Sequence, residues 1–443
     1  MNAPPSRTFG EPRGARCTRP HEVTSRKHHW GQPVARTLTS TRGNTGMGAV
    51  LRVPGMPAVF TAHAVSMAGT LAAEVALSIL VFQRTSSAFL SALVLVCSFL
   101  PYAVGGTLLS SLADRFPPRR VLVCCDLLSA ACIATMLIPG LPVPALLGLL
   151  LVTGFVAPLF QGARAAGLSH LLGADLFPVG RSLLRTISQS AVVSGFALGS
   201  VLVAAIGPLW LLACDATSFL LSAALIGWCT QATPAADPDG ERTLRSVISA
   251  SADGLRHLRA NPPLRRLIQL TWAVPGFSAV GDGLAVAYTA QAGAPVTTAG
   301  VLFTGYAAGT VLGELIVARM RPKTRGSLVL PLVLLSQLPL ICFAFGPPLP
   351  MAAALLLLSG AGFACNQGID PLILAGSEPA LRGRLFTIQT SGLMTVQGVV
   401  IAVSGALGSH TRPGLVIAVF GVLGALTVLW LAWRSPAAKW GVR

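Results

Sequence analysis

The sequence predicts an all-α membrane protein with twelve transmembrane helices in two six-helix bundles, and three observations support this. Hydrophobic residues make up 53% of the 443 residues and charged residues only 11%, whereas a soluble domain carries about 25% charged residues. Apolar runs near the length of a membrane span, about 20 residues, recur along the whole chain. Basic residues gather in the turns between these runs. So few charges cannot cover a soluble core of this size, so the predicted surroundings are lipid.

The apolar runs are separated by turns rich in Gly and Pro, as in "IPGLPVP" and "FGPPLP", and such clusters end helices. None of the runs alternates polar and apolar residues with a period of two, which argues against the strands of a β-barrel. In the fifth run, Gly195 and Gly199 form a small-residue face that favours close helix packing. The predicted spans are 59–82, 88–112, 121–137, 143–160, 188–206, 209–229, 267–290, 299–318, 328–345, 351–374, 388–407 and 414–433.

The distribution of Lys and Arg predicts the orientation of these spans. Thirty of the 32 basic residues fall in the two termini or in alternate loops, and only Arg84 and Arg412 fall on the opposite side. Cytoplasmic loops carry such an excess of Lys and Arg. We therefore predict a multi-pass protein of the cytoplasmic (cell or inner) membrane with both termini in the cytoplasm. Adding or removing one span would destroy this alternation.

The longest internal loop divides the chain into six spans plus six. We predict bundles at 53–230 and 267–434, a cytoplasmic linker at 231–266 and a cytoplasmic tail at 435–443. The basic segment 1–52 is rich in Pro, Gly, Ser and Thr and lacks the apolar core of a secretory signal, which predicts disorder. Within the linker, "LRSVISASADGLRHLRANPPLRRL" is basic and amphipathic, which predicts a helix at the inner membrane surface.

The two halves repeat each other at corresponding positions. After the second span of each half come "ADRFPPRR" and "ARMRPKTR", and after the fourth come "FPVGRSLL" and "ALRGRLFT". Each pair by itself is a weak match. Together the two pairs indicate a six-plus-six repeat, which is typical of secondary transporters.

The chain resembles the major facilitator superfamily over roughly residues 50–435, and within it the twelve-span drug/proton antiporters of the enterobactin-exporter-like group. The stretch "SLADRFPPRR" is similar to that superfamily's signature G-x-x-x-D-R-x-G-R-R between spans two and three. Asp114 and Arg115 match it, while Ser110 and Pro117 stand at the two glycine positions.

Two further stretches carry the resemblance. "QGARAAGLSHLL" resembles the inner end of span four, and "GFALGSVLVAAIGPLWLLACDATSFLLSA" resembles spans five and six of the same group. The antiporter element of span five usually reads G-P-A-L-G-G. Here Phe196 and Ser200 replace the proline and the last glycine, which weakens the inference of antiport and leaves the fold untouched.

The resemblance implies a conformational latch on the cytoplasmic side. In such a latch Asp114 is held by cations and a helix N-terminus, and the cluster breaks when the inner side opens. The alternative is an ordinary solvated turn whose arginines only fix it on the inner side. The residues of the implied latch are Asp114, Arg115, Arg119, Arg120, Arg164 and, at the start of span eleven beside Arg382, Arg384.

Acidic residues within apolar runs are costly and are therefore candidate functional groups. Our first candidate for carrying a proton is Glu74 in span one, which resembles a position near the central cavity that is often acidic in these exporters. Burial favours the neutral form of a carboxyl group and so makes proton loading possible near neutral pH. Asp282 in span seven is the next candidate. Asp215 in span six belongs either to the pathway or to interhelical hydrogen bonding.

The other polar residues of the spans are weaker candidates. Asp126 and Glu314 lie towards the inner ends, where a salt bridge with a loop arginine is the favoured interpretation, and Asp370 lies on the same side. The polar residues that could touch a substrate are Gln291, Asn366 and Gln367.

The function that follows is secondary active transport by alternating access. The sequence lacks the GxxxxGK[ST], HExxH and GxSxG motifs, so we expect no enzyme activity, no cofactor, no metal and no nucleic-acid partner. The resemblance implies proton-coupled export of a drug-like or secondary-metabolite molecule by a carrier that functions as a monomer in the bilayer. The alternatives are a proton-coupled uptake carrier, a uniporter, or a non-transporting membrane sensor or assembly protein.

Overall fold

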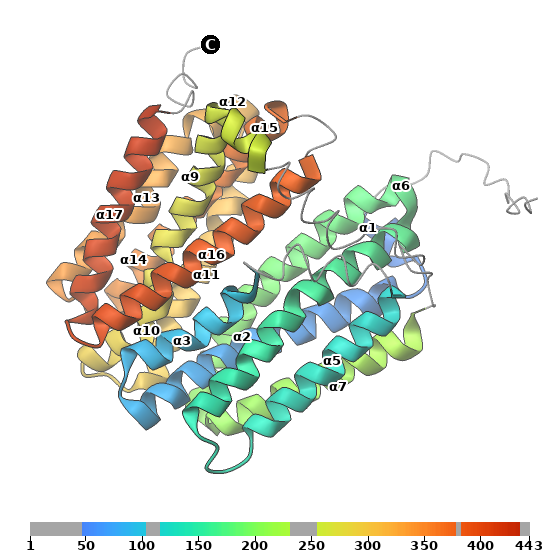
Figure 1. Ribbon diagram of the computed structural model, residues 1–443, viewed down its shortest axis with the longest axis horizontal. Coiled ribbons are helices and arrows are strands. Elements are labelled where there is room, and N and C mark those ends of the chain that lie inside the picture. The colour runs from blue at the N-terminus through green and yellow to red at the C-terminus, as the bar shows by residue number, and fades with distance from the viewer. Residues whose placement is uncertain (1–46, 103–115, 231–254, 378–381, 435–443) are drawn as a thin grey trace, which may run out of the picture. The chain divides into compact units, whose positions relative to one another are not determined.

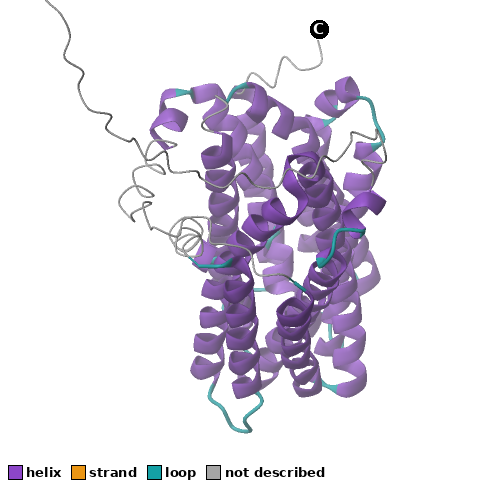
Figure 2. Cartoon of the chain, turned by 90° about the vertical axis from the view of Figure 1, so that its right-hand side faces the viewer, coloured by secondary structure: helices purple, strands orange, loops and turns teal. Residues whose placement is uncertain are grey.

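The computed structural model describes residues 47–102, 116–230, 255–377 and 382–434, and the regular elements in these ranges are all helical (Figures 1 and 2). The predicted disordered segment lies outside them up to residue 46, as do the predicted C-terminal tail and the linker up to residue 254. In the N-terminal half the helices are α1 (Met47–Leu51), α2 (Met56–Thr85), α3 (Ala88–Phe99), α5 (Pro118–Met136), α6 (Val143–Ile206) and α7 (Pro208–Cys229).

In the C-terminal half, short 3₁₀ segments lie between several of the α-helices. The elements of this half are α9 (Pro262–Ser278), α10 (Val280–Gln291), η1 (Val296–Ala299), α11 (Gly300–Ala318), α12 (Pro322–Ser327), α13 (Val329–Ile341), η2 (Cys342–Phe345), α14 (Leu349–Ala361), η3 (Gly362–Cys365), α15 (Asn366–Ala375), α16 (Arg382–Gly408) and α17 (Pro413–Arg434).

The helices confirm the all-α membrane class. Among the described residues, eight helical stretches are long and apolar enough to cross a membrane, and shorter apolar helices occupy Ala88–Phe99 and Ser190–Ile206. Part of the predicted span 88–112 lies outside the described residues. The predicted spans 121–137 and 267–290 correspond to α5 and to the pair α9 and α10. The count of twelve spans is consistent with these helices and stays a prediction.

Two predicted spans of the C-terminal half are interrupted rather than continuous. Span seven is divided into α9 and α10 at Ala279, and span ten into α14, η3 and α15. Pro275 lies inside α9 and Pro371 inside α15. Proline removes one backbone N–H donor and clashes with the preceding turn, so it weakens the helical hydrogen-bond ladder at these points.

Helix α6 is longer than any predicted span because the predicted turn at 161–187 is itself helical. A straight run of 64 residues would measure about 96 Å, about three times the thickness of a bilayer core. The run is not straight. The side chain of Leu172 packs against Gly180, whereas in a straight helix these two residues would lie about 12 Å apart along the helix axis. Gly154 on the first arm packs against α3, and Gly195 on the second arm packs against α2. The two arms occupy the predicted fourth and fifth spans.

Small residues bring helices into close contact in both halves. The predicted face of Gly195 and Gly199 lies against Ala68 and Ala72 of α2. In the C-terminal half, α11 packs on α14 through glycines spaced four residues apart, of which Gly309 lies against the backbone of α14. A side chain at these positions would separate the helices, so glycine permits the close approach.

The main contacts between the two halves join the ends of helices that the charge pattern places outside. Gly405, near the end of α16, packs against Ala92 of α3, and these two helices lie side by side in Figure 1. The rings of Phe196 (α6) and Phe303 (α11) stack with centroids 5.5 Å apart. The hydroxyl of Ser409 accepts a hydrogen bond from the backbone at the start of α3. The halves are therefore closed against each other at their predicted outer ends.

Candidate transport pathway

Glu74 lies in the middle of α2 and is 8% exposed. The hydroxyl of Ser98 on α3 lies close to its carboxyl group. Its charge also acts on Asp215 of α7 and on Asp282 of α10. The structure therefore brings together the three acids singled out for the proton pathway, although they come from three helices and from both halves of the chain.

Asp215 is the most deeply buried of the three acids, at 2% exposed. Its Oδ1 accepts a hydrogen bond from Ser218 Oγ at 3.2 Å. The same oxygen lies against the backbone of Gly69 on α2, where a methyl group would come within 2.6 Å of it. The hydrogen bond stays within α7, and the contact with α2 is one of close packing, so the choice between the pathway and interhelical hydrogen bonding stays open for Asp215.

Asp282 lies in the first turn of α10, directly after the interruption at Ala279, and is half-buried. Its charge acts on the hydroxyl of Tyr306 in α11, which lies close to Ser278 at the end of α9. Glu74 and Asp282 thus place one carboxyl group on each half of the protein. Among the described residues, neither of them forms an ion pair with a cation.

Two carboxylates that interact in a medium of low dielectric constant cannot both be ionised cheaply. A proton or another cation that enters the site lowers this cost, and its release restores the repulsion. Glu74 belongs to the N-terminal half and Asp282 to the C-terminal half. A change in the charge of either carboxyl group therefore changes the electrostatic interaction between the two halves. The pair can therefore convert proton binding into a conformational preference.

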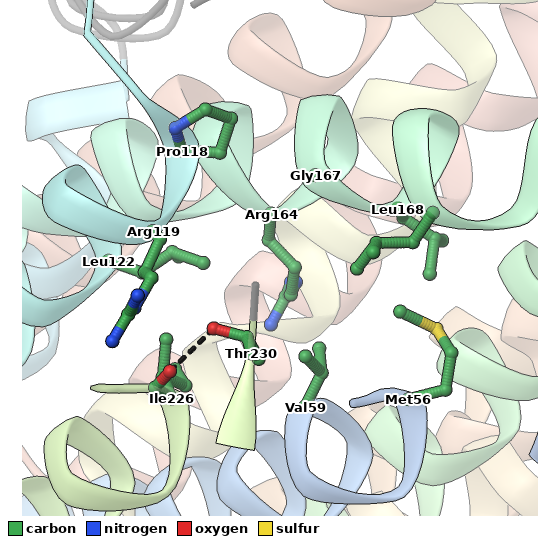
Figure 3. A pocket seen from close by; sticks show the side chains of 11 residues that line it. Met56, Val59, Pro118, Arg119, Leu122, Arg164, Gly167, Leu168, Ile226 and Thr230 are labelled. Atoms are coloured by element: carbon green, nitrogen blue, oxygen red, sulfur yellow. Dashed lines mark hydrogen bonds between the residues drawn. The ribbon is translucent and has the colours of Figure 1, made fainter. Parts of the chain in front are cut away.

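The predicted latch is only partly described. Asp114 and Arg115 lie outside the described residues, and so does the side chain of Arg384 at the start of α16. Arg119 and Arg164 line one small pocket of about 20 Å³, Arg119 from α5 and Arg164 from α6 (Figure 3).

The latch arginines that the structure describes differ in their surroundings. Arg120 is exposed, whereas Arg119 is half-buried and donates a hydrogen bond to the backbone carbonyl of Gly227 at the end of α7. Arg164 contacts Nδ1 of His63 and lies over the ring of Phe160 at 5.5 Å. The latch itself stays a prediction, because its carboxylate lies outside the described residues.

Asp126 differs from its expected role. It is 1% exposed, and its Oδ2 accepts a hydrogen bond from Ser222 Oγ at 2.6 Å. Within the described ranges it forms no ion pair with a loop arginine, and its Oδ1 has no hydrogen-bond partner. Its charge acts instead on Arg164. The residue faces the interior of the N-terminal bundle because α5 packs against both α6 and α7, which its position along the span could not reveal.

The polar residues considered for substrate contact have local partners. Oε1 of Gln291 accepts a hydrogen bond from Gly414 N at 3.1 Å and so caps the start of α17. Gln367 Nε2 donates to the backbone carbonyl of Glu314 at 2.8 Å. Gln389 Nε2 donates to Oδ1 of Asp370 at 3.3 Å. Asn366 is buried, and its Oδ1 lacks a partner within the described part of the chain.

Sequence reasoning missed three polar residues close to these groups. His63 is 6% exposed, and its Nε2 lies 2.7 Å from Ser188 Oγ while Arg164 contacts its other nitrogen. Ser98 lies near the end of α3 and Tyr102 three residues beyond that end, and each has an electrostatic interaction with Glu74. The sequence shows only that these residues are polar and lie within apolar runs. That alone does not tell which face of the helix they occupy.

Comparison with known proteins identifies the class. The family model described as Major Facilitator Superfamily matches residues 59–367, and the chain belongs to this superfamily of membrane transporters. The expected family and fold class are confirmed, and the chain is a non-enzymatic carrier.

The similar curated proteins are efflux carriers. The chain is 27% identical over 353 residues to the multidrug efflux pump Tap of Mycobacterium tuberculosis, covering 75% of this chain and 82% of the pump. It is 26% identical over 375 residues to the enterobactin exporter EntS of Shigella flexneri, covering 81% of this chain and 86% of the exporter.

Solved structures share the fold at low sequence identity. The nucleoside transporter NupG superposes with a TM-score of 0.64 at 14% identity, covering 85% of this chain and 98% of NupG. The inward open conformation of the xylose transporter XylE from E. coli gives a TM-score of 0.62 at 14% identity, covering 86% and 95% of the two chains. These likenesses concern the fold alone.

Proposed function

We propose that the protein exports a drug-like or secondary-metabolite molecule in exchange for protons across the cytoplasmic membrane, with both termini inside and as a monomer. The observation that carries this proposal is the interaction of Glu74 with Asp282 across the two halves. The similarity to Tap and EntS supports the outward direction of transport.

The proposed cycle follows from electrostatics. With the outer ends closed, substrate reaches the acids from the cytoplasm, and the repulsion between Glu74 and Asp282 favours binding of either a proton or a positively charged substrate. The contacts between the halves then open at the outer ends and form at the inner ends. Substrate leaves on the outside, and a proton neutralises Glu74. The neutral pair lets the outer ends close again, and the proton is released inside. Proton and substrate thus alternate at one site.

The experiment uses everted membrane vesicles and a fluorescent efflux dye chosen by a susceptibility screen of a host with and without the gene. Glu74→Gln mimics a permanently protonated carrier, so pH-driven transport should collapse while exchange of substrate without a gradient survives. Glu314→Gln is the matched control, because it makes the same change in α11 at a site assigned no role in the proton pathway, and we expect near wild-type transport.

Two results would count against the proposal. Wild-type proton-driven transport by Glu74→Gln would remove Glu74 as the proton carrier and move the role to Asp282 or Asp215. Accumulation of dye against its gradient in right-side-out vesicles or whole cells would instead indicate an uptake carrier.

A further inference from the structure

His63 lies near the predicted inner end of α2 and joins this helix to both arms of α6. Its side chain is 6% exposed. Its Nε2 lies 2.7 Å from Ser188 Oγ on the second arm. Nη1 of Arg164, on the first arm, contacts Nδ1 and lies 3.3 Å from Nε2. The transport cycle proposed above does not use this buried imidazole, although a histidine can change its charge near neutral pH.

The hydrogen-bond partners of the ring determine its protonation state. The hydroxyl of Ser188 donates to the backbone carbonyl of Leu184 at 2.9 Å, so its oxygen is left to accept a hydrogen bond from Nε2–H. A guanidinium group has only donors, so Arg164 requires a lone pair on Nδ1. His63 is therefore neutral in this arrangement and carries its one ring proton on Nε2.

Arg164 has a second acceptor within the same bundle. Oδ1 of Asp126 on α5 is buried and has no hydrogen-bond partner within the described part of the chain, while Oδ2 accepts from Ser222 of α7. Leu122 lies one turn before Asp126 on the same face of α5, and Ile226 lies one turn beyond Ser222 on α7. Both line the small pocket that Arg164 enters from α6 (Figure 3). The unpartnered oxygen is therefore about one helical turn from that pocket.

We propose that His63 is a second proton-binding site, at which a proton and the guanidinium of Arg164 compete for Nδ1, and that Arg164 moves to Oδ1 of Asp126 when the proton binds. The inference goes beyond the proposed function, because it involves none of the three acids of the pathway. A proton from water forms the N–H bond at Nδ1. Arg164 keeps its own protons, and Asp126 accepts as an ionised carboxylate.

The charges of the two groups give the physical reason for the competition. A protonated imidazole has a donor on each nitrogen, so Nδ1–H would face the donors of a guanidinium with the same charge. Two cations repel each other strongly at contact distance in a buried site. The carboxylate of Asp126 offers Arg164 a charge-assisted hydrogen bond instead. The pocket of about 20 Å³ is large enough for one water molecule, which needs about 10–15 Å³, so water can carry the proton to this site.

Few other charged groups face His63 from the elements packed against α2. The described side chains of α6 contribute only Arg164, and α1, α3 and η1 contribute no charged side chain. Asp215 of α7 lies against α2 about two turns further out, and α10 contributes only Asp282. Arg119 of α5 lines the pocket, but its hydrogen bond goes to a backbone carbonyl at the end of α7. Arg164 is therefore the cation that decides whether the ring can take up a proton.

The exchange moves one cation between two helices. With a neutral His63, Arg164 joins α6 to α2, and with a protonated His63 it joins α6 to α5. Both contacts lie near the predicted cytoplasmic ends of these helices. The pH of the cytoplasm thereby sets which pair of helices is joined at the inner side of the N-terminal bundle.

The test titrates His63 directly and needs no transport substrate. The full-length protein, with the other six of its seven histidines replaced, is labelled with ¹⁵N-histidine and titrated in detergent by nuclear magnetic resonance. The ¹⁵N shifts report which ring nitrogen carries a proton, and we expect Nε2 in the neutral ring. Arg164→Met removes the competing cation at similar side-chain length. The midpoint of His63 protonation should therefore rise by about 1–3 pH units.

Arg119→Met is the matched control for this variant. It removes a cation from the same pocket whose hydrogen bond goes to α7, so the midpoint should move far less than in Arg164→Met. Equal shifts in the two variants would show a general effect of the charge in the pocket and would overturn the competition. A neutral His63 with its proton on Nδ1 would overturn it as well.

Asp126→Asn tests the second acceptor. The amide keeps the size of the side chain and an oxygen for Ser222, but it offers Arg164 no charged acceptor. Protonation of His63 then leaves Arg164 without its new partner, so the midpoint should fall by about 1–2 pH units. Asp215→Asn is the control, because it removes a buried carboxylate that faces α2 at another level and should leave the midpoint unchanged.

The outcomes decide between this site and a purely structural contact. An unchanged midpoint in both Arg164→Met and Asp126→Asn would overturn the proposal. If Arg164→Met does not fold in detergent, Asp126→Asn decides alone, and an unchanged midpoint there has the same meaning. A rise in Arg164→Met without a fall in Asp126→Asn would refute the move to Asp126. None of these measurements involves Glu74, so each outcome leaves the proposed function as it stands.

Discussion

The contact between α16 and α3 at the predicted outer ends permits a sharp test of alternating access. The Cα of Gly405 faces α3 so closely that a methyl group there would lie 2.6 Å from Ala92 Cβ and 3.3 Å from Phe89 Cα. Gly405→Ala therefore cannot be accommodated unless the two helices move apart. We expect this variant to populate the state in which the outer ends are separated.

The magnitude follows from the size of the overlap. Relieving it requires the helices to separate by about 1 Å, since methyl groups pack at about 3.5–4.0 Å, and overpacking of this kind costs about 1–3 kcal/mol. The penalty applies only when the outer ends are closed. The gain in helix propensity from replacing glycine, about 0.5–1 kcal/mol, applies to both states and cancels. The ratio of outer-open to outer-closed molecules should therefore rise about five- to 150-fold.

Pulsed electron spin resonance measures this ratio from the distance between two labels. Arg84→Cys and Thr411→Cys, made after replacement of the nine native cysteines, place exposed labels at the outer ends of the two halves. Gly398→Ala is the matched control. It also faces α3, but a methyl group there would lie 3.6 Å from Leu100 N, which is an ordinary contact.

The expected result is a longer label distance that gains population in Gly405→Ala and not in Gly398→Ala. If both variants gave the wild-type distance distribution, the outer contact would not limit opening. The account of these helix ends as the outer gate would then be refuted.

Two further predictions concern the N-terminal bundle. Asp114→Asn should slow transport strongly while leaving membrane insertion intact, because it removes the charge of the implied latch and little volume. If this variant transports at the wild-type rate, the latch is wrong and the turn is an ordinary solvated turn. Ser222→Ala should lower the free energy of unfolding in detergent by about 1–3 kcal/mol, because it removes the hydrogen bond that Ser222 donates to buried Asp126. Ser404→Ala, which loses only a bond to its own helix, is its control, and equal losses would show that the interhelical bond contributes nothing.

The sequence by itself determined the class of the protein. Composition and the positions of the apolar runs require helices in lipid, because every backbone polar group in a bilayer must be satisfied within its own segment. The placement of Lys and Arg predicted the orientation, and the short motif around Asp114 led to the family. These properties depend on local sequence and on the bilayer, so no knowledge of helix contacts was needed.

The same local signals missed where helices bend or break. The turn expected after span four is helical in α6, and span seven is interrupted at Ala279. A helix bends back or breaks where neighbouring helices pack against each arm, as Gly154 and Gly195 do on opposite arms of α6. Apolar periodicity does not contain that information.

Only the tertiary structure decided which polar residues meet. Glu74, Asp215 and Asp282 were chosen because acids in lipid are costly, yet nothing in their spacing shows that they interact across three helices. Asp126 was assigned to a loop arginine and instead accepts a bond from Ser222, and Tyr102 was overlooked. The physical reason is that the rotation of each helix about its axis is set by contacts between residues far apart in the chain. Those contacts, rather than position along the span, decide whether a polar side chain faces lipid, a neighbouring helix or the pathway.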